Sequence, residues 1–124
     1  MTYRNLFLST ALATFFSLAA VAADFNGAWT AAIETQLGTQ NYTFTFKVDG
    51  EKLTGRAKSQ FAEADTEITE GIVKGDDISF VENLNFQGMP LRIVYKGKIS
   101  GDEIKFTRNV ADIADEPFVA KRSK

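Results

Sequence analysis

Two stretches of this chain repeat one pattern: residues 71–82 read GIVKGDDISFVE, and residues 97–108 read GKISGDEIKFTR. In both, apolar residues alternate with polar ones on either side of a Gly-Asp pair. Alternation at a period of two predicts a half-buried β-strand, and glycine as the first residue of a two-residue loop is typical of a type II′ hairpin turn. A fainter copy, FKVDGEKLTG, occupies residues 46–55. The repeats therefore predict three β-hairpins.

The same alternation extends along most of the chain and predicts an all-β fold of eight strands. We expect them at residues 25–36, 41–48, 53–59, 67–74, 77–86, 91–100, 103–110 and 118–122. No segment offers a helix for a parallel crossover, so the strands form an antiparallel meander. Eight strands can close into an up-and-down β-barrel, and an open sandwich of two sheets is the alternative. The expected interior includes Trp29, Phe44, Phe46, Ile78, Phe80, Ile93, Ile104 and Phe106.

The first residues have the features of a secretory signal peptide. Arg4 supplies a positive start, residues 6–21 an apolar run, and residues 20–22 an Ala-Val-Ala cleavage site. The apolar run is shorter than the ~20 residues that a membrane span needs, so no stable membrane anchor is expected. We therefore predict a signal peptide at 1–22 and a single barrel domain at 23–124, exported to the periplasm or the extracellular space.

Composition excludes several kinds of chemistry. The chain has no cysteine and no histidine, which excludes a Ser-His-Asp triad, a thiolate nucleophile and the usual zinc sites. Loss of residues 1–22 removes Arg4 and no acidic residue, which changes the net charge from -2 to -3 and argues against nucleic acid as a partner. No metal or cofactor is expected. Any catalysis would use Asp, Glu, Lys, Arg, Tyr, Ser or Thr.

The turns also fix which residues face each other across each hairpin. Counting outward from the Gly-Asp and Gly-Glu turns places one glycine opposite one phenylalanine in all three hairpins. The predicted pairs are Gly71 with Phe80, Gly97 with Phe106, and Phe46 with Gly55. A ring placed in this way covers the backbone that glycine leaves bare, and glycine lets a small barrel bend.

A candidate site follows from the same register. Glu82 and Arg108 occupy the same place in the two repeats, on the face that carries the buried phenylalanines. Glu82 should face Ile93, and Tyr95 should face Arg108, so the three polar side chains meet inside the barrel. They lie towards the end with the longer connections, 60–66 and 111–117, and the turn at residues 87–88. That end is the expected mouth, because binding residues concentrate on loops.

Three interpretations of this cluster stay open. Glu82, Tyr95 and Arg108 form a binding site for a small polar or amphipathic ligand, under a rim of Phe61, Phe86 and Met89. Alternatively, they catalyse a metal-independent elimination, isomerisation or hydration, possibly of a sugar. In the third interpretation Glu82 and Arg108 form a structural salt bridge in a filled barrel, which then serves a structural or protein-interaction role. The sequence does not predict an oligomeric state.

Gly27-Ala28-Trp29 at the start of the first strand resembles the G-x-W signature of lipocalins and their calycin relatives. The chain also resembles short secreted bacterial barrels that end on Phe-x-Ala-x-Arg, here residues 118–122. The resemblance implies that Trp29 packs at the closed end of the barrel beneath a basic residue of the last strand, Arg122. It carries little information on function. The helix that flanks the lipocalin barrel and its long first loop are both missing.

Overall fold

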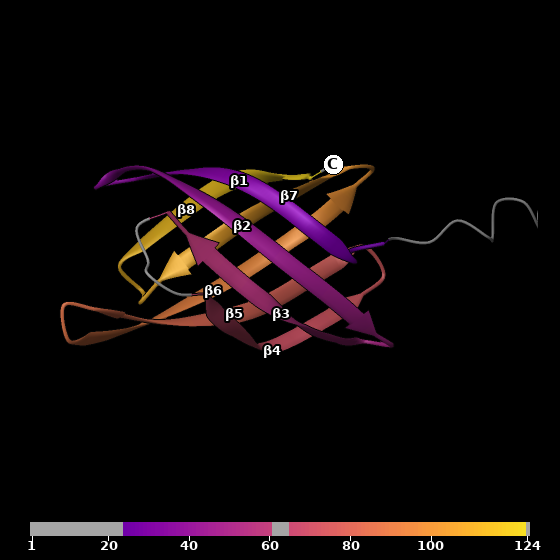
Figure 1. Ribbon diagram of the computed structural model, residues 1–124, viewed down its shortest axis with the longest axis horizontal. Helices are drawn as coiled ribbons and strands as arrows, with labels where there is room; N and C mark the ends of the chain where they lie inside the picture. The colour runs from indigo at the N-terminus through magenta and orange to yellow at the C-terminus, as the bar shows by residue number, and fades with distance from the viewer. Residues whose placement is uncertain (1–23, 61–64, 124) are drawn as a thin grey trace, which may run out of the picture.

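Eight antiparallel strands, each paired with its neighbours in chain order, form a closed barrel in the computed structural model, which describes residues 24–60 and 65–123 (Figure 1). The strands are β1 (Gly27–Thr35), β2 (Gly38–Asp49), β3 (Lys52–Ser59), β4 (Thr66–Lys74), β5 (Asp77–Phe86), β6 (Met89–Ser100), β7 (Glu103–Val110) and β8 (Ala114–Arg122). The predicted all-β barrel is confirmed and the sandwich is not formed. The predicted signal peptide, residues 1–22, lies outside the described residues.

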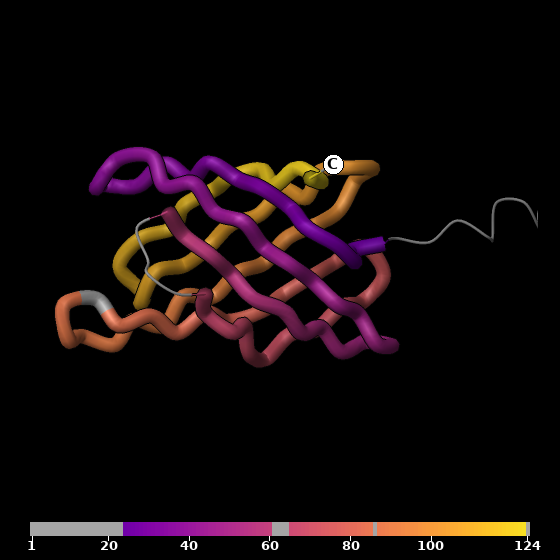
Figure 2. Tube along the Cα trace, viewed as in Figure 1, coloured from indigo at the N-terminus to yellow at the C-terminus, as the bar shows by residue number. Residues whose placement is uncertain are grey.

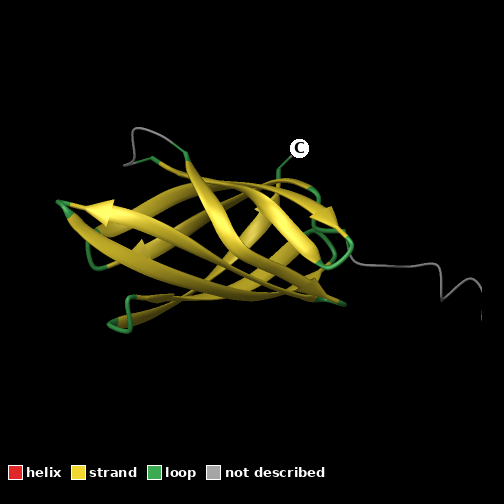
Figure 3. Ribbon diagram, turned by 90° about the horizontal axis from the view of Figure 1, so that it is seen from below, coloured by secondary structure: helices red, strands yellow, loops and turns green. Residues whose placement is uncertain are grey.

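The two ends of the barrel carry different connections, as Figure 2 shows. The turns β2–β3, β4–β5 and β6–β7 lie at one end, here called the closed end, at the right of the view. The connections β1–β2, β5–β6 and β7–β8 lie at the other end, here called the mouth, where β3 ends and β4 begins. Figure 3, turned by 90°, shows strands joined by short loops in the described part. That part contains no helix of the length and apolar character needed to cross a membrane.

The closed-end turns follow the predicted chemistry. Gly75 and Gly101 have φ angles of 59° and 63°, and the residues that follow them keep negative φ. Positive φ at the first central position alone is the type II′ arrangement. The flanking register pairs, Val73 with Ile78 and Ile99 with Ile104, are the expected ones.

Two of the three glycine–phenylalanine pairs are confirmed: Phe46 pairs with Gly55, and Gly97 with Phe106. The third pair is wrong. The β4–β5 ladder shifts between Thr69 and Ile72, so that two residues, Glu70 and Gly71, lie opposite Phe80. Glu70 takes a φ of 53° in this β-bulge. Its side chain points outward, where it pairs with Arg92.

The last strand is longer than predicted. Residues 111–117 were expected to form a loose connection, but β8 begins at Ala114, and Thr107 pairs with Pro117. The backbone N–H of Arg122 donates to the carbonyl oxygen of Asp102, on the side of β7. Successive N–H groups of a regular strand point to opposite sides, so those of the odd-numbered residues in β8 point towards β1. The β1–β8 ladder covers Ala120–Arg122 and does not reach Pro117. A proline is tolerated there because no ladder hydrogen bond is lost.

Aromatic rings fill the middle of the barrel. The ring of Phe44 lies within 6.2 Å, centroid to centroid, of six other rings. The six are those of Tyr42, Phe46, Phe80, Tyr95, Phe106 and Phe118. All eight residues predicted for the interior are buried. Aromatic pairs at these separations stabilise a core beyond the area they bury.

The closed end is sealed by Trp29 and Arg122. The Arg122 guanidinium carbon lies 4.3 Å from the centroid of the Trp29 ring, which is the contact that the resemblance implies. Arg122 also donates to the carbonyl oxygens of Asn26 and Asp24, at 3.1 and 2.8 Å. The Trp29 indole N–H donates to the carbonyl oxygen of Phe25 at 2.9 Å. These bonds tie the chain entering β1 to the end of β8.

Candidate functional site

The predicted register places the three polar residues of the site together. Glu82 pairs with Ile93 on β6, and Tyr95 pairs with Arg108 on β7, as expected. All three polar side chains face the interior: Glu82 is 1% exposed, Tyr95 0% and Arg108 3%. Charged side chains are almost never this deeply buried unless they are paired. Their partners therefore decide what the cluster is.

The hydrogen bonds run in a chain instead of forming one salt bridge. The Tyr95 hydroxyl donates to Glu82 Oε1 at 2.7 Å. Arg108 Nη1 donates to the Tyr95 hydroxyl at 3.1 Å, and Arg108 Nε donates to Glu116 Oε1 at 2.6 Å. The expected direct pair of Glu82 with Arg108 is replaced by contact through Tyr95. The ion pair of Arg108 is made with Glu116.

Sequence reasoning missed two members of this cluster. Glu116 was assigned to a loop, although Ala114, Glu116, Phe118 and Ala120 alternate with exposed residues as a strand requires. Tyr42 lies in the strand expected at residues 41–48, and it was not predicted as part of the site. Its ring centroid lies 5.3 Å from the Arg108 guanidinium carbon. Here we call Tyr42, Glu82, Tyr95, Arg108 and Glu116 the buried cluster.

Burial controls the ionisation of the cluster. It raises the pKa of the Glu82 carboxyl, although Tyr95 and Arg108 oppose the shift. Burial, together with the charge of Glu82, also raises the pKa of Tyr42 and lifts that of Tyr95 well above its ordinary value. Burial would lower the pKa of Arg108, but Tyr95 and Glu116 outweigh it and raise the pKa. The two phenols therefore stay protonated and Arg108 stays charged at neutral pH.

This arrangement restricts what the cluster can do chemically. Glu82 is its best placed proton acceptor, because Arg108 and Glu116 are held as an ion pair. Solvent has little access to the cluster, because the Arg108 side chain is 4% exposed and that of Glu116 is 13% exposed. Among the described residues, every buried side-chain polar atom has a hydrogen-bond partner. No three acidic side chains in the described ranges could hold a metal ion together.

The raised pKa of Glu82 gives a pH-dependent prediction. The folded state holds this proton more tightly than the unfolded chain, so the free energy of unfolding falls as pH rises from 4.5, the ordinary value, through the raised pKa. Glu82→Gln keeps the acceptor for Tyr95 and carries no charge. We expect this variant to melt above the wild type at pH 7, with the difference shrinking on acidification.

Glu116→Gln is the matched control for that measurement. The same loss of one negative charge removes the ion-pair partner of Arg108, so this variant should melt below the wild type at pH 7. Thermal unfolding curves at several pH values measure both effects. A Glu82→Gln variant less stable than the wild type at pH 7 would show that ionised Glu82 stabilises the fold.

Large apolar side chains project at the mouth. Leu37, in the β1–β2 turn, is 70% exposed, Met89, beside the β5–β6 turn, 62%, and Ile113, in the β7–β8 connection, 79%. Met89 was predicted at the rim, whereas Leu37 and Ile113 were not. Phe61 lies outside the described residues, as does the side chain of Phe86, so their rim positions stay predictions.

The buried cluster and the exposed apolar residues of the mouth lie close to each other along the strands. Arg108 faces Glu116 two register steps before the β7–β8 connection, with Val110 and Ala114 between them and the turn. Val110 and Leu84, both partly buried, pack on the core beneath the exposed tips. The buried cluster therefore forms a polar layer just below the mouth. Comparison of the chain with protein-family models, curated proteins and solved structures finds no match.

Proposed function

We propose that the protein is an exported barrel that binds a small amphipathic ligand at its mouth. The observation that carries the proposal is the contrast between the two ends of the barrel. The described mouth connections carry Leu37, Met89 and Ile113, all largely exposed. The closed-end turns instead carry Gly-Glu or Gly-Asp pairs. The three side chains come from three connections at the same end of the barrel, and a binding surface would form where their apolar areas join.

The filled interior supports a ligand that lies at the mouth instead of deep in the lumen. Phe44 and the rings around it occupy the middle of the barrel. The apolar part of the ligand would contact the exposed tips, with Phe61 and Phe86 as further expected contacts. The polar part would point down towards the buried cluster, where Glu82, Tyr95 and Arg108 hold Glu116 in place.

The chemistry of the polar part follows from the outermost member of the cluster. Glu116 presents a carboxylate, whose free acceptor positions suit a hydroxyl or ammonium donor and disfavour an anion. The exposed residues Glu34, Asp112 and Asp115 add negative charge at the same end. We therefore propose a neutral or cationic head group, such as a sugar or an amine, on an apolar tail. The closed eight-stranded barrel is compatible with a binding role.

Titration calorimetry with octyl glucoside and octylammonium, both below their micelle concentrations, tests this function. Leu37→Ser and Ile113→Ser should each weaken binding about fivefold, the effect of withdrawing roughly half of a buried aliphatic side chain. Ile72→Ser, which changes a half-exposed apolar residue on the outer wall, should leave affinity unchanged. Octanoate should bind more weakly than either probe. Equal loss in all variants, or no binding of either probe, would contradict the proposal.

Catalysis by Glu82, Tyr95 and Arg108 stays a second hypothesis. The raised pKa of Glu82 suits a general acid or base, but the groups are closed from solvent by their own contacts. A reaction would need Glu116 or the mouth loops to move. The amphipathic ligand requires no such movement, so binding is the function that the geometry supports best.

A further inference from the structure

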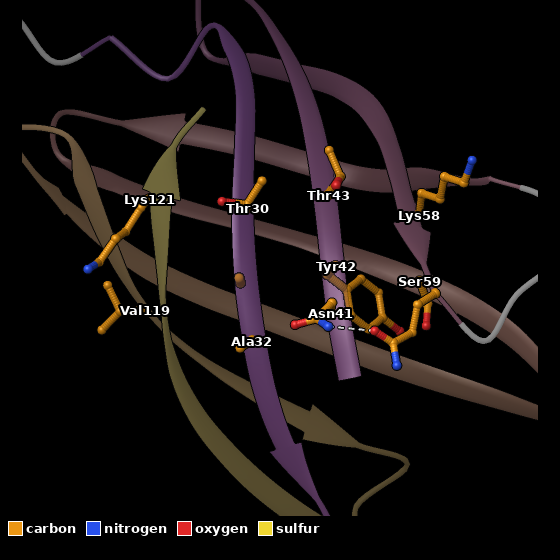
Figure 4. Close-up of a pocket in the computed structure, with 11 residues that line it drawn as sticks. Thr30, Ala32, Asn41, Tyr42, Thr43, Lys58, Ser59, Val119 and Lys121 are labelled. Carbon is orange, nitrogen blue, oxygen red and sulfur yellow. Dashed lines mark hydrogen bonds between the residues drawn. The ribbon is translucent and has the colours of Figure 1, made fainter. Parts of the chain in front are cut away.

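A hollow of about 700 Å³ lies on the outer wall of the barrel, over β1 and β2 (Figure 4). The hollow forms because the outward side chains of β1 at its centre, Thr30 and Ala32, are small. Longer side chains stand on either side, Lys121 on β8 and Lys58 on β3. The hollow opens on the outer wall, and Tyr42 is the one member of the buried cluster among its lining residues.

The middle of the hollow offers uncharged polar groups, which are hydroxyls and amides. Thr30 and Thr43 face each other across β1 and β2 and are exposed on the outer face. Asn41 Nδ2 donates to Gln60 Oε1 at 2.6 Å, drawn in Figure 4, which orients both amides and leaves the Asn41 carbonyl and the Gln60 amino group for a ligand. Hydroxyls and amides that both donate and accept match the hydroxyl groups of a sugar.

The charge of the hollow has one sign. Among the described residues, Lys58 and Lys121 are its charged lining residues, and no carboxylate of residues 24–60 or 65–123 lines it. Lys121 lies 4.0 Å from Glu103, but both side chains are well exposed and such a pair is weak. The exposed face of β2 and β3 beside it is balanced in charge: Lys47, Lys52 and Arg56 point outward, together with Asp49, Glu51 of the turn and the Asp65 that pairs with Arg56. The two lysines of the hollow are therefore the positive groups that a ligand would meet here.

The two lysines are too far apart for one small anion. They lie on β8 and β3, three strand spacings apart, which is about 14 Å at ~4.8 Å per spacing. Figure 4 shows them on opposite sides of the hollow, with Thr30 and Thr43 between them. A ligand that meets both must be extended, with negative charges near its ends and hydroxyls along its length. We propose that this hollow binds an acidic oligosaccharide, one whose sugars carry carboxylates.

Calorimetric titration with tetragalacturonate, and with maltotetraose as its neutral counterpart, tests this proposal on the mature protein. Tetragalacturonate should bind, more weakly as salt is added, and maltotetraose should not. The double variant Lys58→Gln/Lys121→Gln should lose at least tenfold in affinity. Lys98→Gln, which removes an equally exposed lysine from the β6 wall, should bind as the wild type does.

A steric variant separates the hollow from general charge. Ala32→Trp fills the floor over β1 and leaves every charge in place, and it should abolish binding of tetragalacturonate. Octyl glucoside should bind at the mouth of Ala32→Trp as it does in the wild type. The tetragalacturonate result therefore tests the hollow, and the octyl glucoside result separately tests the proposed function at the mouth. No binding of tetragalacturonate, equal binding of maltotetraose, or full affinity in Ala32→Trp would each overturn the inference.

Discussion

Replacing Arg108 by methionine should lower the free energy of unfolding by about 3–5 kcal/mol. The variant leaves the Glu116 carboxylate without its ion-pair partner, and it removes the cation that contacts Glu82 through Tyr95. Urea denaturation at pH 7 measures the loss. Adding Glu116→Gln to Arg108→Met should recover part of it, because the second change removes one of the two unpaired charges.

Arg92→Met is the matched control. Arg92 makes a bidentate ion pair with Glu70, at 2.7 and 3.0 Å, but the side chains of both residues are more than half exposed. Loss of an exposed pair should cost less than about 1 kcal/mol. If Arg108→Met is as stable as the wild type, or more stable, the buried cluster does not support the fold. Arg108 would then be held for a ligand, since groups kept for function often reduce stability.

Gly55→Ala should destabilise the barrel by roughly 3 kcal/mol, at the upper end of the usual cost of overpacking. A Cβ at this position would collide with the backbone carbonyl oxygen of Thr45 and lie 3.2 Å from the Phe46 Cα. Those atoms belong to the neighbouring strand, so β2 and β3 would have to separate. The close approach is the physical basis of the Phe46–Gly55 pair.

The control for Gly55→Ala is Gly50→Ala. Gly50, in the β2–β3 turn, has a φ of 64° and open space where a Cβ would stand. Alanine there meets only the backbone strain of a positive φ, about 1 kcal/mol. Denaturant midpoints of the two variants compare the effects directly. Similar small losses at both positions would mean that the strands of the β2–β3 hairpin are not in tight contact at Gly55.

Most of the barrel could be predicted because its local signals are strong. Glycine in the β4–β5 and β6–β7 turns fixed the count of residues along β5, β6 and β7, and that count placed Glu82, Tyr95 and Arg108 inside. The predicted register is wrong in β4, where a bulge adds one residue that has no partner of its own on β5. The bulge at Glu70 and Gly71 has no signal in the alternation, because an extra residue in one strand is revealed only by its partner strand.

The partners within the site were harder to predict. Pro117 interrupted the pattern of the last strand, so Glu116 was assigned to a loop and its pairing with Arg108 was missed. The β1–β2 turn contains no Gly-Asp pair, and Leu37 was not recognised as a mouth residue. There Thr35 stabilises the turn through its hydroxyl, which donates to the Gly38 carbonyl oxygen and accepts from the Leu37 N–H.

Amide chemical-shift mapping by NMR during titration with octyl glucoside is the most direct test of binding at the mouth. The account predicts shifts for the amides of Leu37, Met89 and Ile113, and none at the closed-end turns around Gly75 and Gly101. Shifts confined to the closed end or to the outer wall, or no shifts at any concentration below the micelle threshold, would contradict it.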